Sequence, residues 1–301
     1  MSSLIEQAAK RLEQLKKAGV ELPEPAAGTP AAPRDEAPPP VVETKAAATA
    51  EPAPQSRKVD LDLLAIAASG IVTPNAPRSA IADEYRIIKR PLISNALGKG
   101  AAPIANGNLI MITSALPGEG KSFTSINLAM SMAAELDTTV MLVDADVARP
   151  SILSTLGLPP APGLLDVLVN DSVDLSDVLL KTNIDKLTIL PSGTRHERAT
   201  ELLASDAMAR LLEDMASRYA DRIIIFDSPP LLLTTEARVL ASHMGQVVVV
   251  VKAEETLQAD VRHALATIAD CPVKLMMLNQ ARSAKGVGYG YAYGYGYGEP
   301  I

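Results

Sequence analysis

Short apolar segments separated by stretches with helical spacing fill the chain from residue 109 onward, and this alternation limits the fold more than any other feature. The apolar segments are residues 109–113, 140–143, 187–190, 223–226, 247–251 and 274–278. Buried strands joined by helices form parallel sheets that are covered on both faces. The sequence therefore predicts an α/β fold with a doubly wound, mostly parallel sheet, whose ligands bind where the strands end.

A glycine loop, Ala115-Leu116-Pro117-Gly118-Glu119-Gly120-Lys121-Ser122, directly follows the first apolar segment. The sequence predicts a helix after it, from Phe123 to Ala134. This context is typical of the phosphate-binding loop of P-loop NTPases, in which main-chain N–H groups surround the phosphates, the lysine contacts the β and γ oxygens and the serine binds Mg²⁺. The expected ATP-binding residues are Gly118, Glu119, Gly120, Lys121, Ser122, Phe123 and Asn279. Asn279, just after the last apolar segment, is expected either to contact the adenine edge or to form a turn.

Three aspartates follow two other apolar segments. Asp144 and Asp146 occupy alternate positions at the end of one strand, so their carboxylates point to the same side. Asp227 ends the segment before Ser228-Pro229-Pro230 and has the position of the Mg²⁺-supporting aspartate of nucleotide hydrolases. We therefore expect Asp144 to act either as a general base or as part of the metal shell. The expected metal ligands are Ser122, Asp146 and Asp227, and the expected catalytic residues are Lys121, Asp144, Asp146 and Asp227.

Composition excludes several classes of protein. The net charge of −7 and the pI near 5.1 provide no basic surface for nucleic acid. The single cysteine, Cys271, allows no internal disulfide and no iron–sulfur cluster, which favours a reducing compartment. No apolar run approaches the roughly 20 residues of a membrane span. We therefore expect a cytoplasmic protein that reaches the membrane only through a partner.

The N-terminal part divides into a helix and a spacer. Ser3 and Glu6 have capping-box spacing, and apolar residues at helical spacing follow them, so residues 1–22 are expected to form an amphipathic helix. This helix either docks on its own domain or tethers the chain to a partner. Residues 23–58 are rich in Pro and Ala and contain no aromatic residue, which predicts a disordered linker. The catalytic domain is expected over residues 59–286.

A second charged helix is expected near the start of that domain, over residues 79–90. Ser79 is a candidate N-cap, and Pro91 is expected to end the helix. Asp83, Arg86 and Lys89 recur at a spacing of three residues, which is also typical of an ordinary solvated helix face. Tyr85 and Tyr219 lie within helical patterns and are interpreted as packing residues.

The last residues, 287–301, form a tyrosine-rich tail that is expected to be flexible. Tyrosines alternate with Gly or Ala in it, at Tyr289, Tyr291, Tyr293, Tyr295 and Tyr297. Such Gly-Tyr repeats lack the branched side chains of a packed core. The tail is therefore either the chain's own phosphorylation substrate or only a sticky disordered segment.

Taken together, the phosphate loop, the two aspartate motifs and the tyrosine tail resemble the bacterial tyrosine kinases (BY-kinases) of exopolysaccharide synthesis and export. The stretch Glu84-Tyr85-Arg86-Ile87-Ile88-Lys89-Arg90-Pro91 is similar to the stand-alone cytoplasmic autokinases of exosortase-linked loci. The resemblance covers residues 59–298. It implies ATP and Mg²⁺ as cofactors, autophosphorylation of the five tail tyrosines, protein tyrosine substrates, a homo-oligomeric ring assembled through Asp83, Arg86 and Lys89, and a separate membrane activator of the chain-length-determinant type.

Three features depart from the family pattern. Ala148 stands where the family usually has Arg, although Arg149 follows. The oligomerisation helix of the family reads Glu-x-x-Arg-x-x-Arg, and Lys89 cannot reproduce the bidentate contact of an arginine. Many relatives are fused to a membrane activator, and this chain carries none.

Two other functions remain open at this point. A ParA/MinD-type ATPase switch has a similar sheet but usually carries a signature lysine early in the loop, at the position of Leu116. A non-catalytic scaffold would not need Lys121, Asp146 and Asp227. Phosphotyrosine formation with Mg-ATP distinguishes these three functions.

Overall fold

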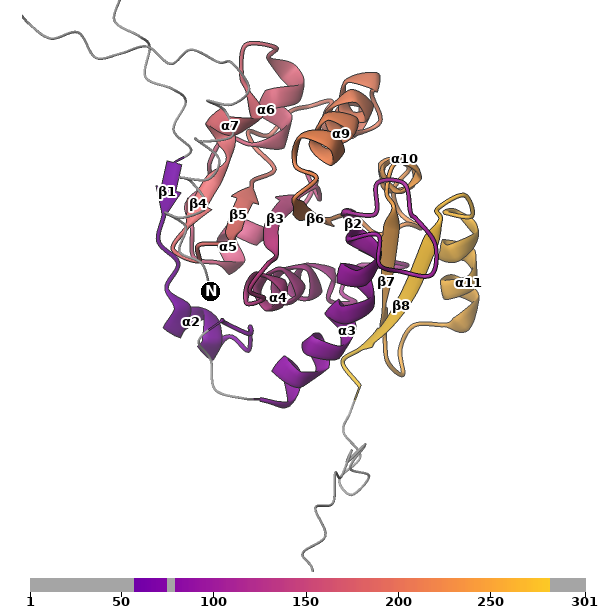
Figure 1. Ribbon diagram of the computed structural model, residues 1–301. Coiled ribbons are helices and arrows are strands. Elements are labelled where there is room, and N and C mark those ends of the chain that lie inside the picture. Colours follow the sequence, from indigo (N-terminus) through magenta and orange to yellow (C-terminus); the bar gives the residue numbers. More distant parts are fainter. Residues whose placement is uncertain (1–56, 75–78, 282–301) are drawn as a thin grey trace, which may run out of the picture. The chain divides into compact units, whose positions relative to one another are not determined.

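The computed structural model describes residues 57–74 and 79–281, which form an eight-stranded sheet in the order β1-β4-β5-β3-β6-β2-β7-β8 (Figure 1). Within it, β2, β3, β5, β6, β7 and β8 are mutually parallel. All six strands expected from the apolar segments are present, and the doubly wound α/β fold is confirmed. Their bounds are β2 Leu109–Ser114, β3 Thr139–Asp144, β5 Leu187–Leu190, β6 Arg222–Asp227, β7 Gln246–Lys252 and β8 Val273–Asn279.

Two short edge strands were not expected from the sequence. β4, Leu180–Thr182, pairs with β5 antiparallel, and β1, Arg57–Val59, pairs with β4 in parallel. The expected linker therefore extended two residues too far, because Arg57 and Lys58 already belong to β1. Each strand has only three residues and little apolar content, so neither produces the long apolar run by which the central strands are recognised.

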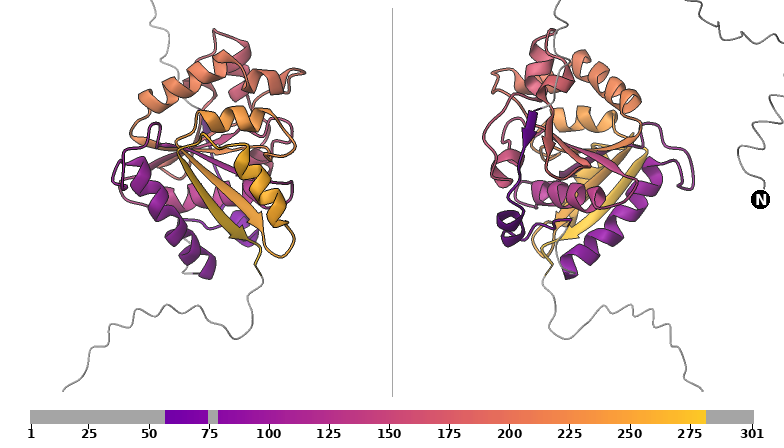
Figure 2. Two further views of the ribbon diagram at one scale, coloured as in Figure 1. Left: turned by 90° about the vertical axis from the view of Figure 1, so that its right-hand side faces the viewer. Right: turned by 60° about the vertical axis from the view of Figure 1, so that its left-hand side comes forward.

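Helices cover both faces of the sheet, as expected for parallel strands (Figures 1 and 2). Alternate residues of each strand separate into two buried clusters: Ile110 and Ile112 belong to one, Leu109 and Met111 to the other. The first face is covered by α2 Leu63–Ala68, α3 Ala80–Ala96, α4 Lys121–Ala133 and α5 Ile152–Thr155. The opposite face is covered by α6 Leu164–Val169, α7 Leu175–Val178, α8 Ala199–Leu203, α9 Asp206–Arg218, α10 Glu236–Ser242 and α11 Gln258–Ala266.

Helix α3 starts after the expected cap, with the Ser79 hydroxyl accepting from Ala82 N–H at 3.2 Å. The expectation that Pro91 ends the helix is wrong, because α3 continues through it to Ala96. Leu92, one residue further on, is fully buried, and its carbonyl accepts a hydrogen bond from Gln246 at 3.1 Å. This tertiary packing outweighs the helix-breaking tendency of an internal proline.

Tyr85 packs in the core with 2% of its surface exposed, as the sequence interpretation expected. Tyr219 is partly buried, and the Arg222 guanidinium lies 4.9 Å from its ring centroid. The expected N-terminal helix, most of the linker and the tail fall outside the described residues. None of the helices in residues 57–74 and 79–281 is long and apolar enough to cross a membrane.

Candidate active site

The glycine loop connects β2 to α4, as the sequence predicted. Gly118 and Gly120 have φ angles of 81° and 94°, which residues other than glycine rarely adopt. Helix α4 begins at Lys121, directly after Gly120, and no side chain caps its N-terminus. The first N–H groups of a helix lack intrahelical partners and attract anions, so the loop and this helix end form a phosphate-binding arrangement.

Within the loop, Glu119 is a structural brace. Its buried carboxylate accepts from the Leu116 N–H at 2.6 Å, from the Thr256 hydroxyl and from the Lys252 N–H at 3.4 Å. These bonds tie the loop to the end of β7. The Glu119 side chain therefore faces away from the phosphate-binding side, and only its main chain remains for the expected nucleotide contact.

The end of β8 lies against the same loop. Asn279 donates its side-chain N–H to the Glu119 carbonyl at 2.9 Å, and Gln280 donates to the Gly118 carbonyl at 3.3 Å. Neither of the two roles expected for Asn279 included this contact. A Cβ atom added at Gly120 would lie 2.2 Å from the Asn279 amide nitrogen, so the two residues leave no room for a larger side chain.

The first three residues of α4 were all expected to bind nucleotide. Lys121 is buried, and its charge opposes the rise in pKa that burial causes in Asp146 and Asp227. Ser122 is partly exposed at the start of the helix. The Phe123 ring packs against the apolar core, so only its main-chain N–H is available to a phosphate.

The strands β3 and β6 place Asp144 and Asp227 directly opposite each other in the sheet register. One oxygen of each carboxylate is satisfied: Asp144 Oδ2 accepts from the N–H groups of Ser151 and Ile152, both at 3.0 Å, and Asp227 Oδ1 accepts from the Ser125 hydroxyl at 3.0 Å. The other two oxygens, Asp144 Oδ1 and Asp227 Oδ2, are buried without a hydrogen-bond partner. Buried acceptors are nearly always paired, so these two oxygens are suited to receive a cation or a proton.

Burial and the charge of neighbouring carboxylates explain the raised pKa values of this pair. Loss of solvent, together with the charge of Asp227, raises the pKa of Asp144 to about 7. Loss of solvent also raises the pKa of Asp227 to about 6, although the nearby hydroxyl groups of Ser122 and Ser125 and the Lys121 charge oppose the rise.

Asp146 follows β3 on the same edge, as the sequence predicted. Its Oδ1 accepts from the Arg149 N–H at 3.2 Å, and burial raises the pKa of its carboxyl while Lys121 lowers it. The site therefore brings together all four expected catalytic residues. In the described part of the chain, no group of three or more His, Cys, Asp or Glu side chains has the arrangement of a metal cluster.

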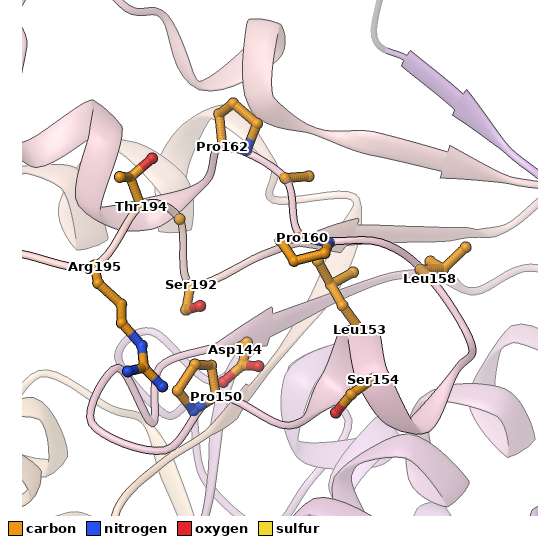
Figure 3. A pocket seen from close by; sticks show the side chains of 12 residues that line it. Asp144, Pro150, Leu153, Ser154, Leu158, Pro160, Pro162, Ser192, Thr194 and Arg195 are labelled. Atoms are coloured by element: carbon orange, nitrogen blue, oxygen red, sulfur yellow. The ribbon is translucent and has the colours of Figure 1, made fainter.

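Beside Asp144 a pocket of about 560 Å³ opens between the segment after β3 and the segment after β5 (Figure 3). Apolar side chains form most of its wall, and Arg195 extends across it toward Pro150, on the side where Asp144 lies. The lining residues are Asp144, Pro150, Leu153, Ser154, Leu158, Pro160, Ala161, Pro162, Ser192, Gly193, Thr194 and Arg195. The sequence did not predict this pocket, because it joins two segments that are about forty residues apart in the chain.

The three residues expected to mediate oligomerisation differ in position. Asp83 and Arg86 are exposed and form an ion pair with each other. Lys89 is buried instead: its ammonium group lies 2.7 Å from Glu135 and donates to the Ser131 carbonyl within the same chain. Its charge is thus already paired inside the molecule, whereas Ile87 on the same helix is 75% exposed.

Sequence reasoning missed three residues of the site. Ser125, which binds Asp227, lies one helical turn after Lys121, so the i, i+4 spacing from the loop lysine could have indicated it. Gln280 follows Asn279 directly. Arg195 carries no local signal, since only the fold brings it to the pocket that Asp144 also lines.

Comparison with known proteins agrees with this geometry. Residues 107–279, which include the loop and all three aspartates, match the family model described as an AAA domain. Together with the sheet order, this match defines the chain as a P-loop AAA-type domain.

The relatives narrow the class further. The tyrosine-protein kinase YwqD of Bacillus subtilis is 30% identical over 206 residues, which are 68% of this chain and 83% of YwqD. The putative tyrosine-protein kinase EpsB of Ralstonia nicotianae is also 30% identical, but the match covers 57% of this chain and only 22% of EpsB. The chain belongs to the bacterial tyrosine kinase family.

Solved structures show the same relationship. The chimerical protein CapA2B2 superposes with a TM-score of 0.61 at 28% identity, covering 76% of this chain and 95% of that one. The VpsO kinase domain superposes with a TM-score of 0.55 at 27% identity, covering 68% of this chain and 100% of that one.

Proposed function

We propose that this chain uses ATP and Mg²⁺ to phosphorylate the five tyrosines of its own C-terminal tail, Tyr289, Tyr291, Tyr293, Tyr295 and Tyr297. The supporting observation is that the described chain leaves β8 at the phosphate loop itself, where Asn279 and Gln280 contact Glu119 and Gly118. From Asn279, the ten residues to Tyr289 span at most about 35 Å. We infer that this length is sufficient for the tail to reach the phosphate-binding site of a neighbouring molecule.

The residues present fit a bound Mg²⁺ ion. Asp227 Oδ2 is buried without a partner at the end of β6, and a carboxylate oxygen of this kind is a ligand that Mg²⁺ prefers. We assign Ser122, Asp146 and Asp227 to hold the ion directly or through water. Bound there, Mg²⁺ neutralises charge on the β- and γ-phosphates during transfer.

The protein itself contributes positioning and charge. The N–H groups of the loop and of the first turn of α4 hold the phosphates, and Lys121 neutralises the γ-phosphoryl oxygens. The phenol oxygen of the acceptor tyrosine forms a bond to the γ-phosphorus, and the bond to the β–γ bridging oxygen breaks, so ADP leaves. Asp144 takes the phenol proton through Oδ1, which has no partner in the described structure.

We further propose that the kinase works as a homo-oligomeric ring in which helix α3 forms part of the contact between molecules. In this ring the tail of one molecule enters the site of the next. Each phosphotyrosine adds about −1.5 to −2 charges, so a fully modified tail is repelled by neighbouring acidic sites and the ring loosens.

We also propose that a separate membrane protein of the chain-length-determinant type recruits the kinase to the inner face of the membrane, where it regulates exopolysaccharide synthesis and export. The relatives that the chain matches include the succinoglycan biosynthesis transport protein ExoP.

A single variant tests the proposed activity. Lys121→Met keeps the loop backbone but removes the buried cation, so phosphotyrosine formation from Mg-ATP is expected to disappear while the circular dichroism spectrum is retained. The matched control is Lys186→Met, because the Lys186 ammonium group donates to the carbonyls of Glu135 and Leu136, which follow the C-terminal end of α4, opposite to the end that carries the loop. A folded Lys121→Met protein that gained phosphotyrosine at the wild-type rate would contradict the active-site assignment.

A second comparison identifies the acceptor. Replacing all five tail tyrosines with Phe is expected to abolish autophosphorylation without changing nucleotide affinity. ATP hydrolysis with no phosphotyrosine in the wild-type chain would instead indicate an ATPase switch.

A further inference from the structure

The pocket beside Asp144 combines apolar walls with the polar side chains of Asp144, Ser192 and Arg195. Its volume of about 560 Å³ falls within the range of roughly 300–1,000 Å³ that is common for ligand pockets. Asp144 lines this pocket, is 1% exposed, and carries one buried oxygen, Oδ1, without a hydrogen-bond partner. Leu153, Leu158 and Pro160 provide apolar wall that suits an aromatic ring.

Arg195 differs from the other lining residues because it is the single basic one. Among the described residues it has no ion-pair partner. An arginine without a carboxylate partner at the mouth of a pocket is suited to bind an anion, and its planar guanidinium matches phosphate with two parallel hydrogen bonds.

The segment that carries Arg195 is held in place by Asp166. The Asp166 carboxylate accepts from the Thr194 N–H at 3.0 Å and from the Gly163 N–H at 2.7 Å. Gly193 has a φ angle of 93°, and a Cβ atom added there would lie 2.5 Å from the same carboxylate. The backbone directly before Arg195 is thus fixed on the wall of the pocket.

The tail provides a ligand with the matching geometry. Its tyrosines recur every second residue, so in an extended chain they lie on one face about 7 Å apart. With one tyrosine ring beside Asp144, the next tyrosine of an extended tail would therefore lie about 7 Å away, a spacing on the scale of the pocket that Asp144 and Arg195 both line. After one transfer, that neighbour carries a phosphate.

We propose that Arg195 binds the phosphate of an already modified tail tyrosine two residues from the acceptor, so that the first phosphorylation of a tail promotes the later ones. This inference rests on the proposed function, since it takes the pocket as the acceptor site of that reaction. Arg195 is a specificity-determining residue here. The chemical step does not require it.

A binding experiment tests this directly and needs no catalysis. The protein is the full chain with its five tail tyrosines changed to Phe, saturated with Mg-ADP to occupy the phosphate loop. The probes are fluorescent peptides of residues 287–301, either unmodified or phosphorylated only at Tyr293. We expect the phosphorylated peptide to bind about tenfold more tightly, as for one charge-assisted bidentate contact.

Variants in the same background assign the effect to one side chain. Arg195→Gln is expected to remove the tenfold difference, and Arg195→Lys to keep only part of it, because an ammonium group lacks the planar fork. Arg198→Gln removes the same charge three residues away, outside the pocket lining, and is expected to keep the full difference. Equal affinity of the two peptides for the starting protein would overturn the proposal, as would an equal loss in the Arg195→Gln and Arg198→Gln variants.

The second readout is the number of phosphates per chain in the wild type and in the Arg195→Gln variant, both with the natural tail. Intact mass spectrometry monitors this number over time after addition of Mg-ATP. In the Arg195→Gln variant, the rates of the later phosphates relative to the rate of the first are expected to fall about tenfold compared with the wild type. Equal rates for all steps in both proteins would overturn the proposal while leaving the kinase assignment intact. Absence of any phosphotyrosine would overturn the proposed function instead, and the peptide affinities would still decide whether Arg195 binds phosphotyrosine.

Discussion

Asn279, the last residue of β8, donates a hydrogen bond of 2.9 Å to the main-chain carbonyl of Glu119 in the middle of the phosphate loop. The two residues are 160 positions apart in the chain. The phosphate loop belongs to the unit β2–loop–α4, and this bond holds it from outside that unit. Nucleotide affinity is therefore expected to depend on the last strand of the sheet, β8.

The first prediction follows from that bond. Asn279→Ala is expected to weaken ATP binding about fivefold, since one hydrogen bond of this kind contributes roughly 1 kcal/mol. Isothermal titration calorimetry measures the affinity. Asn170→Ala, which removes an exposed turn contact to Ser172, serves as the control and is expected to leave ATP affinity unchanged. Equal affinities of Asn279→Ala and wild type would show that the loop holds its shape unaided.

The second prediction compares the two loop glycines. Both have positive φ angles, but only a Cβ at Gly120 meets another atom, the Asn279 amide nitrogen at 2.2 Å, whereas a Cβ at Gly118 meets nothing within 4 Å. Gly118→Ala therefore adds only backbone strain of about 1–3 kcal/mol. Gly120→Ala adds a steric clash as well and is expected to abolish nucleotide binding.

Combining Gly120→Ala with Asn279→Ala separates the two contributions. The double variant removes the clash but keeps the strain and lacks the Asn279 bond, so its nucleotide affinity is expected to rise to about fivefold below that of Gly118→Ala. A double variant as inactive as Gly120→Ala alone would mean that the clash does not determine the loss.

The third prediction concerns pH. Burial raises the pKa of Asp144 to about 7 and that of Asp227 to about 6 in the folded protein, both above the ordinary pKa of 3.8. Between pH 4 and 7 the folded protein thus holds protons that the unfolded chain has lost. Its free energy of unfolding without ligand is therefore expected to fall as the pH rises through this range. Thermal melting between pH 5 and 8 measures the effect.

The variants Asp144→Asn and Asp227→Asn test the source of that dependence. Each is expected to raise the Tm at pH 8 and to flatten its decrease with pH, because a neutral side chain replaces a buried charge. A melting temperature that rises between pH 5 and 8 in the ligand-free wild type would contradict the assignment. In the kinase reaction the expected trend is opposite, since Asp144 accepts a proton only when ionised, so the rate should increase through pH 7.

The fourth prediction separates two positively charged residues of α3. Lys89 is buried against Glu135 at 2.7 Å, so Lys89→Ala removes the buried partner of this carboxylate and leaves it the exposed Arg90 at 3.3 Å; the free energy of unfolding is expected to fall by about 2 kcal/mol. Arg86 is exposed and forms an ion pair with Asp83 on its own helix, so Arg86→Glu is expected to leave the Tm nearly unchanged but to reduce the oligomer mass.

Chemical denaturation and light scattering coupled to size exclusion measure these two quantities. Loss of assembly in a stable Lys89→Ala protein, with an intact oligomer in Arg86→Glu, would reverse the roles of the two residues.

The central part of the fold could be read from the sequence because β2, β3, β6 and β7 are buried on both faces and therefore appear as continuous apolar runs. β1 and β4 were missed because each is three residues long and depends on its neighbours for its conformation. The continuation of α3 past Pro91 was missed for a similar reason, since the burial of Leu92 is a property of the tertiary structure.

The candidate site shows the same limit. Lys121, Asp144, Asp146 and Asp227 could be recognised because each lies at a strand end or in a loop whose local pattern is distinctive. Arg195 and the role of Asn279 could not, because both depend on contacts between distant segments. Lys89 illustrates the opposite error: its spacing suggested an exposed contact, but the structure buries its charge against Glu135.

The contact of β8 with the phosphate loop has a further consequence for how the tail behaves as a tether. Strand β8 is an edge strand that pairs only with β7, and its last residues carry both the loop contacts and the covalent link to the tail. Under the proposed transfer between molecules, a force on the tail would act first on Asn279 and Gln280. Capture of the tail is then expected to loosen the chain's own nucleotide loop, so that a molecule serving as substrate would hold its nucleotide less firmly than one acting as enzyme.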